Sequence, residues 1–385
     1  MNEHEFIVDK RNVMIISRGI PSTEEPTNGL FEWDQAIALH DYGVNVAYVV
    51  IDLRSFRKKR KLGFSHKIEN GIDIFTMAIP IGPIYKGLFI KIGSWAVSYI
   101  YRKVKEKWGM PDILHAHFLD YGYMSVKLSK KENIPLVLTD HSSDYNSYCA
   151  ISNYAKKLYE QTAKVIAVSN DMKERIYRWT GTEAKVVHNL VKVSTGINVR
   201  EKQYYQRFIS AGNLVPEKNY LKLVNAFSKV ENKNISLVIY GDGPEEKKIK
   251  DLISDLDMEQ RIELRHKVPR EQLLRMYEEM DAFILVSKQE TFGVAYIEAL
   301  ACGLPVIATN CGGPRDFVNS QNGIIVDPNQ EEQIIQAISN IASNKYKFDC
   351  RHISRETIEN FSPMVIAQKL CEVYDENLQH LNKED

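Results

Sequence analysis

The sequence predicts an α/β protein in which two Rossmann-like, doubly wound parallel sheets face each other across a cleft. Two observations predict this fold class. Short β-branched and aliphatic runs alternate with segments whose apolar residues recur at helical spacing, as in successive βαβ units. The runs form two sets, separated at residues 191–206 by a polar stretch without clear periodicity. Ligands of such sheets bind beyond the carboxyl ends of the strands, so we expect the chemistry in the loops there.

The first set of apolar runs predicts the strands of a first domain, residues 1–195. These strands cover residues 13–16, 44–51, 72–79, 113–117, 136–139, 165–169 and 186–188. Loops are expected where proline, glycine and charged residues gather, and they include the basic segment at residues 54–64.

The second set predicts the strands of a second domain, residues 196–362. These strands cover residues 208–212, 237–240, 262–265, 282–286, 306–308 and 324–326. The last periodic segment begins at Pro363, where proline is favoured as a first helical residue, and Ser362 is its candidate N-cap. Residues 363–385 are therefore expected to form a terminal helix.

Composition excludes several classes of protein. The chain has 385 residues, 44% of them hydrophobic, and its 50 basic residues balance 50 acidic ones, which is typical of packed globular domains and not of disorder. The polar start of the chain is unlike a secretory signal, and lysines interrupt the longest apolar stretch, so no membrane span is predicted. Five cysteines without a C-x-x-C pair argue against a disulfide framework and a structural zinc site. A cytoplasmic protein is expected.

The segment from Ser287 to Pro305 carries the strongest candidate site. A buried strand is followed by a polar loop and an alanine-rich helix, whose amino-terminal amides and dipole would bind a phosphate. The amides are those of Phe292, Gly293 and Val294. Glu290 and Glu298 could each accept hydrogen bonds from two vicinal hydroxyls, as on a sugar and a ribose. As alternatives, Glu290 is only a helix-terminal charge and Glu298 a solvated residue, or the two are a glycosidase acid and nucleophile.

Two other loops of the second half are candidates for the same ligand. Lys218 is expected at a helix start, where a cation opposes the helix dipole, and an anionic ligand would relieve that conflict. An ordinary surface lysine is the alternative. Gly243 lies in a Gly-Asp-Gly turn after another strand, where it would permit close approach of a ligand or would only form a tight turn.

In the first half, the loop of residues 21–29 ends at Gly29, just before a helix. His115, His117 and His141 lie at the ends of predicted strands, where an imidazole can donate to a phosphate or move a proton near neutral pH. Metal binding by His115 and His117 is an alternative, although alternate residues on a strand often mark one structural face. We assign no metal site.

A basic segment in the first half suggests contact with a membrane surface. Its cations are Arg57, Lys58, Lys59, Arg60 and Lys61, and an apolar, lysine-punctuated stretch follows at residues 79–108. This combination is typical of surfaces that dock on anionic lipid headgroups. A merely solvated basic loop is an equal alternative. Nucleic acid is not expected as a partner, because no nucleic-acid-binding module accompanies the charges.

The motifs at residues 207–327 resemble those of retaining glycosyltransferases of group 1, family four, which have the GT-B fold. They are GNLVPEKN, VIYGDGP, HKVPREQLLRMYEEMDAFILVSKQETFGVAYIEALACGLPVIAT and CGGPRD, in the order found in that family. PDILHAH, LTDHSSDY, VIAVS and VVHNLV extend the resemblance more weakly through the first half. The family's terminal helix crosses back to the first domain, which holds the acceptor.

The resemblance implies a nucleotide-sugar donor bound mainly to the second domain. It places Lys218 at the diphosphate, Glu298 on the ribose and Glu290 on the transferred sugar. The backbone near Val268 would meet the base, and His141 would reach towards sugar and acceptor. The complete implied donor site is Gly29, Asn213, Lys218, Gly243, Val268, Glu290, Thr291, Phe292, Gly293, Val294 and Glu298, with Glu290, His141 and Lys218 as catalytic residues.

The sequence departs from the family pattern at two positions. Asn213 stands where many members have a phosphate-binding arginine, and Asp316 where a glutamate is usual. The first change weakens the positive clamp on the diphosphate, although an amide can still donate a hydrogen bond to an oxygen.

The resemblance implies sugar transfer with retention, in which the departing diphosphate itself takes the acceptor's proton. No protein nucleophile, metal or cofactor is then required. We expect a UDP-sugar, or else GDP-mannose, as donor and a glycan or lipid-linked acceptor in cell-surface polysaccharide synthesis, at the inner face of the membrane. The alternatives are a nucleotide-sugar epimerase, a phosphorylase or an inactive partner subunit.

Overall fold

The computed structural model describes residues 11–22, 25, 27–55, 57, 60–141, 153–192, 199, 201 and 204–381. The chain divides into two compact units, each built on its own sheet. Unit 1 comprises Met1–Leu190 together with Pro363–Asp385, and unit 2 comprises Val191–Ser362. The two predicted α/β domains with parallel sheets are confirmed.

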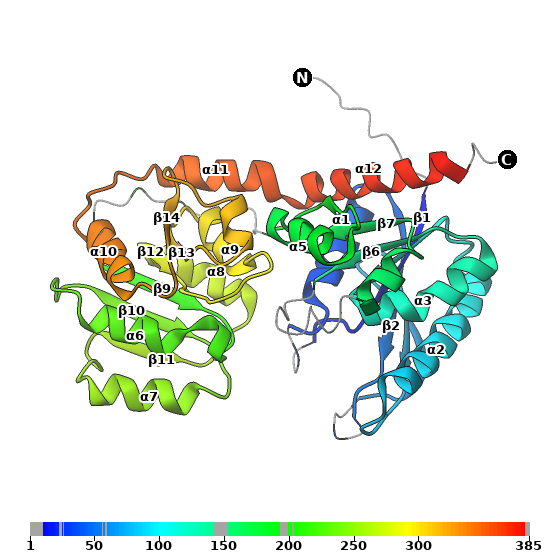
Figure 1. Ribbon diagram of the computed structural model, residues 1–385, viewed down its shortest axis with the longest axis horizontal. Helices are drawn as coiled ribbons and strands as arrows, with labels where there is room; N and C mark the ends of the chain where they lie inside the picture. Colours follow the sequence, from blue (N-terminus) through cyan, green and yellow to red (C-terminus); the bar gives the residue numbers. More distant parts are fainter. Residues whose placement is uncertain are drawn as a thin grey trace. The chain divides into compact units, whose positions relative to one another are not determined.

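Unit 1 contains a sheet in the order β3-β4-β2-β1-β5-β6-β7-β8, parallel except for β3 (Figure 1). Its strands are β1 (Asn12–Ser17), β2 (Asn45–Asp52), β3 (Gly63–Glu69), β4 (Ile72–Ala78), β5 (Ile113–His117), β6 (Leu136–Asp140), β7 (Lys164–Ala167) and β8 (Lys185–Val186). Its helices are α1 (Leu30–Asp41), α2 (Lys86–Lys107), α3 (Leu119–Glu132), a helix at residues 153–159, α5 (Asn170–Thr180) and α12 (Pro363–Leu381).

The last helix, α12, completes the hydrophobic core of unit 1. It packs along α1, at the opposite end of the sequence (Figure 1). Ile366, Leu370 and Tyr374 recur at helical spacing and are fully buried in one cluster with side chains of α1, β1 and β2. Burial of each such side chain stabilises unit 1 by roughly 1.5–3 kcal/mol.

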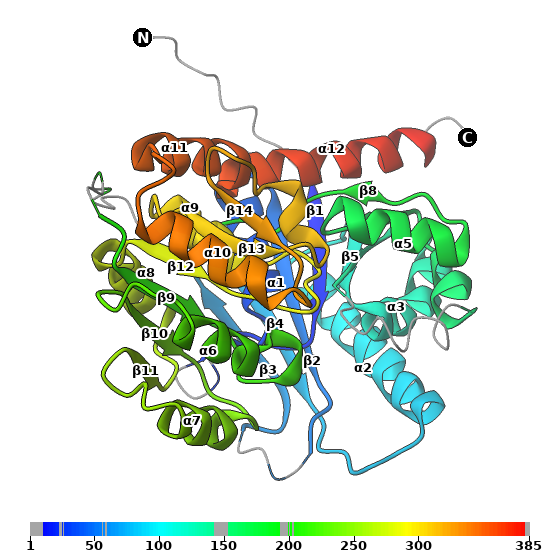
Figure 2. The same cartoon turned by 60° about the vertical axis from the view of Figure 1, so that its left-hand side comes forward.

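Unit 2 contains an all-parallel sheet in the order β11-β10-β9-β12-β13-β14. Its strands are β9 (Arg207–Ala211), β10 (Ser236–Tyr240), β11 (Ile262–Arg265), β12 (Ala282–Ile284), β13 (Val306–Thr309) and β14 (Gly323–Val326). Its helices are η1 (Pro216–Lys218), α6 (Tyr220–Ser228), α7 (Glu246–Asp255), α8 (Arg270–Glu279), α9 (Val294–Ala301), η2 (Gly313–Asp316), α10 (Glu331–Ala342) and α11 (Cys350–Phe361). Helix α6 packs against α7 and α10 (Figure 2), and α9 packs against α8 and α11.

Each sheet has a switch point, where successive crossovers change direction. In unit 1 the switch point lies between β1 and β5, and in unit 2 it lies between β9 and β12. The loops that leave the carboxyl ends of these central strands diverge to opposite faces of the sheet and leave a crevice between them. The residues that follow these four strands are therefore the first place to look for a site.

Strand β3 is a correction to the sequence analysis, which placed a loop up to Phe64 and no strand after it. The segment pairs antiparallel with β4 and forms the edge of the sheet. An edge strand buries little, and its sequence GFSHKIE therefore lacks the continuous apolar run that identified the buried parallel strands.

The units divide between Leu190 and Val191, whereas the sequence placed the boundary after residue 195. The backbone N–H of Val191 donates to the carbonyl of Phe361, 2.8 Å away, which joins it to unit 2. The predicted linker spans residues 191–206. Most of its residues between 193 and 203 lie outside the described part of the chain.

Candidate active site

Two candidate residues meet at the switch point of unit 2. Lys218 ends η1, in the loop after β9, and Glu290 lies in the loop after β12. The Lys218 Nζ is 2.5 Å from Glu290 Oε1, and the Ser287 hydroxyl donates to the same oxygen at 2.9 Å. Glu290 is buried, and the Lys218 side chain is 22% exposed. The site therefore holds a cation and a carboxylate that are partly withdrawn from water.

Backbone hydrogen bonds hold both loops in place. The Glu290 N–H donates to the Cys311 carbonyl at 3.1 Å, and the Glu290 carbonyl accepts from the Gly313 N–H at 3.1 Å. The Lys288 N–H donates to the Glu217 carbonyl, 2.7 Å away, so the Glu290 loop is fastened to η1 as well. The charged pair thus lies on a backbone fixed from three loops, which favours a preorganised site.

The N-cap residue of α9 follows Glu290 by three positions. Gly293, the N-cap residue, has φ of 100°, a conformation that favours glycine, and an added Cβ would lie 2.7 Å from the Tyr296 ring. Within the described part of the chain, the amides of Gly293 and Val294 have no protein acceptor. The amides and the helix dipole together can bind an anion. Between these amides and Glu290, Thr291 is partly buried.

Phe292 is buried, whereas Thr291 and Gly293 on either side of it are only partly buried. Its ring is buried, with its centroid 5.2 Å from that of Phe317 and 5.8 Å from that of Phe361. The side chain therefore anchors the loop in the core, and only its main chain is placed to serve a ligand.

A second ion pair lies further along α9. Glu298 is buried, and its Oε1 is 2.6 Å from the Nε of Arg270, the first residue of α8. Val268, the residue predicted beside a nucleotide base, is partly buried two positions before Arg270. The structure thus joins the Val268 segment to Glu298 through an arginine to which the sequence analysis gave no role.

Backbone hydrogen bonds join the loop containing Asn213 to the loop containing Gly243. The Leu214 N–H donates to the Asp242 carbonyl at 2.9 Å, and the Leu214 carbonyl accepts from the Glu245 N–H at 3.0 Å. A Cβ on Gly243 would lie 2.4 Å from the Leu214 carbonyl oxygen, so glycine is required here by the neighbouring backbone. Asn213, the residue before Leu214, is exposed.

At the switch point of unit 1, Gly29 caps α1 with φ of 70°, and an added Cβ would lie 2.2 Å from the Gly19 carbonyl oxygen. One turn into α1, the fully buried Glu32 has its Oε1 3.3 Å from Arg18 Nε. Burial raises the pKa of the Glu32 carboxyl, against the opposing effect of Arg18. The sequence analysis missed this pair, because neither residue belongs to a recognisable motif.

His141, at the end of β6, contacts His117, at the end of β5. The His141 Nε2 is 3.0 Å from His117 Nδ1, and the rings stack with centroids 5.3 Å apart. Burial lowers the pKa of His141 to about 3, and Arg18 contributes to this shift. Next to His117, Phe118 has φ of 66° and packs on His141 with centroids 4.9 Å apart. A positive φ at a non-glycine residue is strained, and the few residues that adopt it cluster at functional sites.

The hydrogen-bond partners of His115 are Tyr374 and Thr139 and do not include His141. The His115 Nδ1 is 2.7 Å from the Tyr374 hydroxyl of α12, and its Nε2 is 2.7 Å from Thr139 Oγ1. Both ring nitrogens are thus engaged in hydrogen bonds, which gives His115 a structural role in place of the metal-binding alternative. Burial lowers the pKa of His115 to about 3.

The structure also brings together Asp242, Glu246 and His266, whose potential metal-ligating atoms lie within 4.8 Å of one another. The sequence analysis did not foresee this group. Two lysines compete for its carboxylates: Lys250 is 2.6 Å from Glu246, and Lys267 is 3.8 Å from Asp242. We assign no ligand to it.

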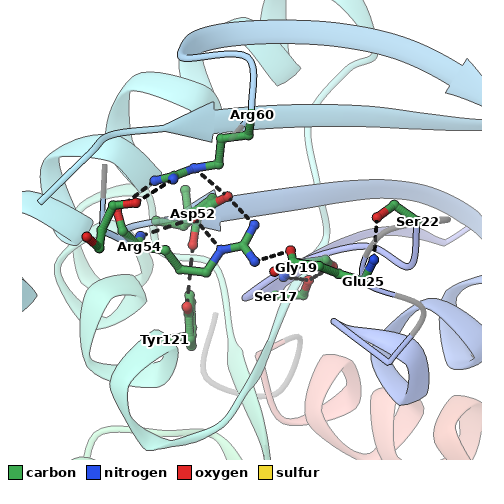
Figure 3. A network of polar contacts seen from close by, with 10 residues as sticks. Ser17, Gly19, Ser22, Glu25, Asp52, Arg54, Arg60 and Tyr121 are labelled. Atoms are coloured by element: carbon green, nitrogen blue, oxygen red, sulfur yellow. Dashed lines mark hydrogen bonds and ion pairs between the residues drawn. The ribbon is translucent and has the colours of Figure 1, made fainter. Parts of the chain in front are cut away.

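The predicted membrane-docking segment is only partly exposed. Arg57 and Lys61 are exposed, whereas Lys58 and Lys59 lie outside the described residues. Arg60 is a correction, because its side chain is 10% exposed and its Nε lies 2.8 Å from Asp52 Oδ2 (Figure 3). Its guanidinium also donates to backbone carbonyls of its own loop, so Arg60 stabilises the loop and does not face a membrane. Among the described residues, no helix is both long and apolar enough to cross a bilayer.

Both halves of the chain match models of sugar-transferring enzymes. Residues 197–360 match the glycosyl transferases group 1 model, and residues 34–195 match the glycosyltransferase family 4 model. The chain therefore belongs to the group 1, family 4 glycosyltransferases, as its motifs indicated.

Individual relatives agree with this family. The chain is 25% identical over 358 residues to the putative teichuronic acid biosynthesis glycosyltransferase TuaC of Bacillus subtilis, covering 85% of this chain and 88% of TuaC. Sucrose-phosphate synthase of Thermosynechococcus elongatus superposes with a TM-score of 0.76 at 18% identity, over 95% of this chain and 99% of that one. HepE of Anabaena, solved in complex with UDP-glucose, gives a TM-score of 0.70 at 17% identity, over 95% of this chain and 99% of that one. The fold is GT-B.

The depressed pKa of His115 predicts a pH-dependent stability. Between about pH 3 and 6.5 the unfolded chain binds a proton at this residue that the folded chain does not, so stability falls as the pH falls below about 6.5. His115→Gln should reduce the slope of unfolding free energy against pH, between pH 5 and 6, by up to about 1.4 kcal/mol per pH unit. Urea denaturation at a series of pH values measures this slope.

Tyr374→Phe is the matched control, because it removes the hydrogen bond to His115 and leaves the imidazole in place. It should lower stability at every pH without flattening the slope. An unchanged slope in His115→Gln would contradict the assignment of a buried neutral imidazole.

Proposed function

We propose that this glycosyltransferase transfers a sugar, with retention of configuration, from a UDP-sugar to a glycan or lipid-linked acceptor in cell-surface polysaccharide synthesis. GDP-mannose is the alternative donor. The observation that carries the proposal is the Lys218–Glu290 pair at the switch point of unit 2, with Glu290 three positions before the N-cap residue of α9. The likeness to HepE with UDP-glucose supports a uridine nucleotide, and the likeness to TuaC supports a polysaccharide product.

The donor's charge matches the groups on unit 2. The diphosphate would bind at Lys218 and the amides of Gly293 and Val294, with Asn213 as a further donor. The transferred sugar would replace Lys218 as a partner of Glu290, whose carboxylate can accept two hydroxyl protons. Glu298 would bind the ribose hydroxyls while Arg270 stays paired with its carboxylate, and the backbone at Val268 would meet the base.

The chemistry requires stabilisation of a leaving group and no protein nucleophile. As the bond from sugar to diphosphate breaks, negative charge grows on the diphosphate oxygen, next to the Lys218 ammonium and the α9 dipole. The acceptor hydroxyl attacks from the same face, and its proton passes to that oxygen. His141, held neutral by burial, would donate or accept a hydrogen bond at the sugar and would not carry a charge.

Lys218→Ala should lower the rate of sugar transfer by about two to three orders of magnitude, because it removes a charge that stabilises the leaving group. Glu290→Gln should have a similar effect through lost hydrogen bonds to the sugar. Lys222→Ala is the control, since this lysine lies on the next helix and bonds to the Asn329 carbonyl. Initial rates of nucleotide release with acceptor measure the effect.

Removing Lys218 leaves the buried Glu290 carboxylate without its cation, so loss of folding must be separated from loss of catalysis. The double variant Lys218→Met/Glu290→Gln removes both charges and should fold while remaining inactive. Wild-type rates in either single variant would refute this site.

Nucleotide binding should raise the melting temperature, because a ligand that binds only the folded state stabilises it by mass action. At one hundred times its dissociation constant the gain is about 2.7 kcal/mol. UDP is expected to stabilise the protein more than GDP, ADP or CMP in a thermal shift assay. Stabilisation by GDP instead would move the donor to GDP-mannose, and no shift at millimolar concentration would favour an inactive partner subunit.

We also propose that an apolar face of unit 1 docks on an anionic membrane. Phe64 of β3 contacts Tyr99 of α2, and Tyr99 stacks on Trp95, which is 56% exposed. Ile68, on the same side of β3 as Phe64, is 65% exposed. Lys61 and Lys91 supply exposed cations from the same two segments of chain. Aromatic rings beside cations are typical of interfacial surfaces.

Trp95→Ser should weaken binding to vesicles containing anionic phospholipid severalfold in a sedimentation assay. The matched control is Trp179→Ser on α5, since Trp179 is 44% exposed in the same unit. Equal binding of the two variants would show that the Trp95 face does not dock.

A further inference from the structure

Unit 1 contains a cavity of about 630 Å³ at the carboxyl ends of β2 and β4, to which no role has been assigned. The size is that of a site for a small organic ligand. The lining residues come from the loops after both strands and from the first turns of α2 and α3. They are Leu53, Ser55, Arg57, Ile81, Gly82, Pro83, Ile84, Lys86, Phe89 and Asp120. The cavity thus lies at the edge of the sheet where parallel α/β proteins bind ligands.

A network of ion pairs holds Arg54 and Arg60, on either side of Arg57, which lines this cavity. Arg54 Nε and Nη2 donate to the two oxygens of Asp52 at 2.9 and 2.8 Å, and Nη1 pairs with Glu25 (Figure 3). Arg60 pairs with the same Asp52 and donates to the carbonyls of Ser55 and Arg54 at 2.9 and 2.7 Å. Two of the loop's cations are therefore occupied within the protein, on either side of Arg57.

The charges that line the cavity do not cancel. Lys86 lies 3.0 Å from Asp120, so these two side chains neutralise each other. Within the part of the chain that the structure describes, the Arg57 guanidinium has no ion-pair partner, and Arg57 is exposed. The described lining residues therefore carry one net positive charge, and the ion pairs of Arg54 and Arg60 lie on either side of Arg57 in the sequence.

The remaining lining is mainly apolar. Leu53, Ile81, Ile84 and Phe89 contribute aliphatic and aromatic surface, whereas Ser55 is the one uncharged polar side chain among the lining residues. A sugar alone would lack hydrogen-bond partners here, because its hydroxyls need several donors and acceptors once they leave water. An anion with an attached aliphatic chain would match both the positive charge of Arg57 and the apolar lining of the cavity.

We infer that this cavity binds the phosphate end of a lipid-linked acceptor, with the phosphate at Arg57 and the first part of the lipid chain against Ile84 and Phe89. The inference rests on the proposed function, because it names the class of acceptor for that reaction. A guanidinium can bind two phosphate oxygens at once, and burial of each methylene of the chain adds to the affinity. A glycan carried on a lipid phosphate thus fits better than a free glycan.

Binding is tested on the full-length chain without any transfer reaction. Isothermal titration calorimetry compares decyl phosphate, inorganic phosphate and decyl maltoside, each below the concentration at which micelles form. Decyl phosphate should bind at least tenfold more tightly than either of the others, since only it combines the charge with the chain. Equal affinity for decyl maltoside, or equal affinity for inorganic phosphate, would overturn the inference.

Variants of Arg57 and Phe89 test whether decyl phosphate binds to the charged side and to the apolar side of the cavity. Arg57→Gln and Phe89→Ser should each weaken decyl phosphate binding about tenfold. The matched controls are Lys107→Gln, an exposed cation of α2, and Trp179→Ser, an exposed aromatic residue of α5, neither of which lines the cavity. Both controls should bind like the wild type, with thermal melts confirming that all four variants fold. Wild-type affinity in Arg57→Gln would also overturn the inference.

The outcome is distinct from that of the activity assays. Decyl phosphate binding that depends on Arg57, in a protein that transfers no sugar, would sustain the cavity and refute the proposed function. Sugar transfer to a lipid-free glycan, without any binding of decyl phosphate, would sustain the function and refute the inferred acceptor class.

Discussion

The strand order of the two sheets is the constraint on which the rest of the structure depends. Because the chain returns to the middle of each sheet and then builds outwards in the other direction, the loops after two adjacent central strands diverge. In unit 2 this places Lys218 and Glu290, which are far apart in the sequence, within hydrogen-bonding distance. In unit 1 the same order places the Arg18 and His117 loops on neighbouring strands. The order of the strands alone therefore places the residues of each polar cluster near one another.

The sequence predicted those parts of the structure that depend on local chemistry. Buried parallel strands have continuous apolar runs, so nearly all were found, and Ile113–His117 and Ile262–Arg265 were found to the residue. Gly293 and Gly29 both have the left-handed backbone that favours glycine, and both were singled out from their positions before helices. Their roles towards a donor remain predictions, because glycine conformation alone does not identify a ligand.

Contacts between distant segments could not be predicted. The partner of Glu298 is Arg270, on another helix, and the partner of Arg60 is Asp52. A carboxylate expected on a ribose and a cation expected at a membrane surface are thus paired within the protein. Strand β3 escaped for a related reason, since its identity comes from pairing with β4 and not from its own apolar pattern. Each of these interactions joins residues whose positions follow no periodic pattern in the sequence. The sequence pattern therefore did not indicate that they would pair.

The position of α12 has a consequence for folding during synthesis. The helix supplies core residues to unit 1, yet it follows all of unit 2 in the chain. At about 5–20 residues per second, the ribosome needs roughly 10–30 s to make residues 191–362 after it has made the first part of unit 1, which ends at Leu190. Throughout that interval the apolar surface of α1 that α12 covers is open to water or to chaperones. Unit 2 can therefore reach its final core before unit 1 does, although unit 1 is made first.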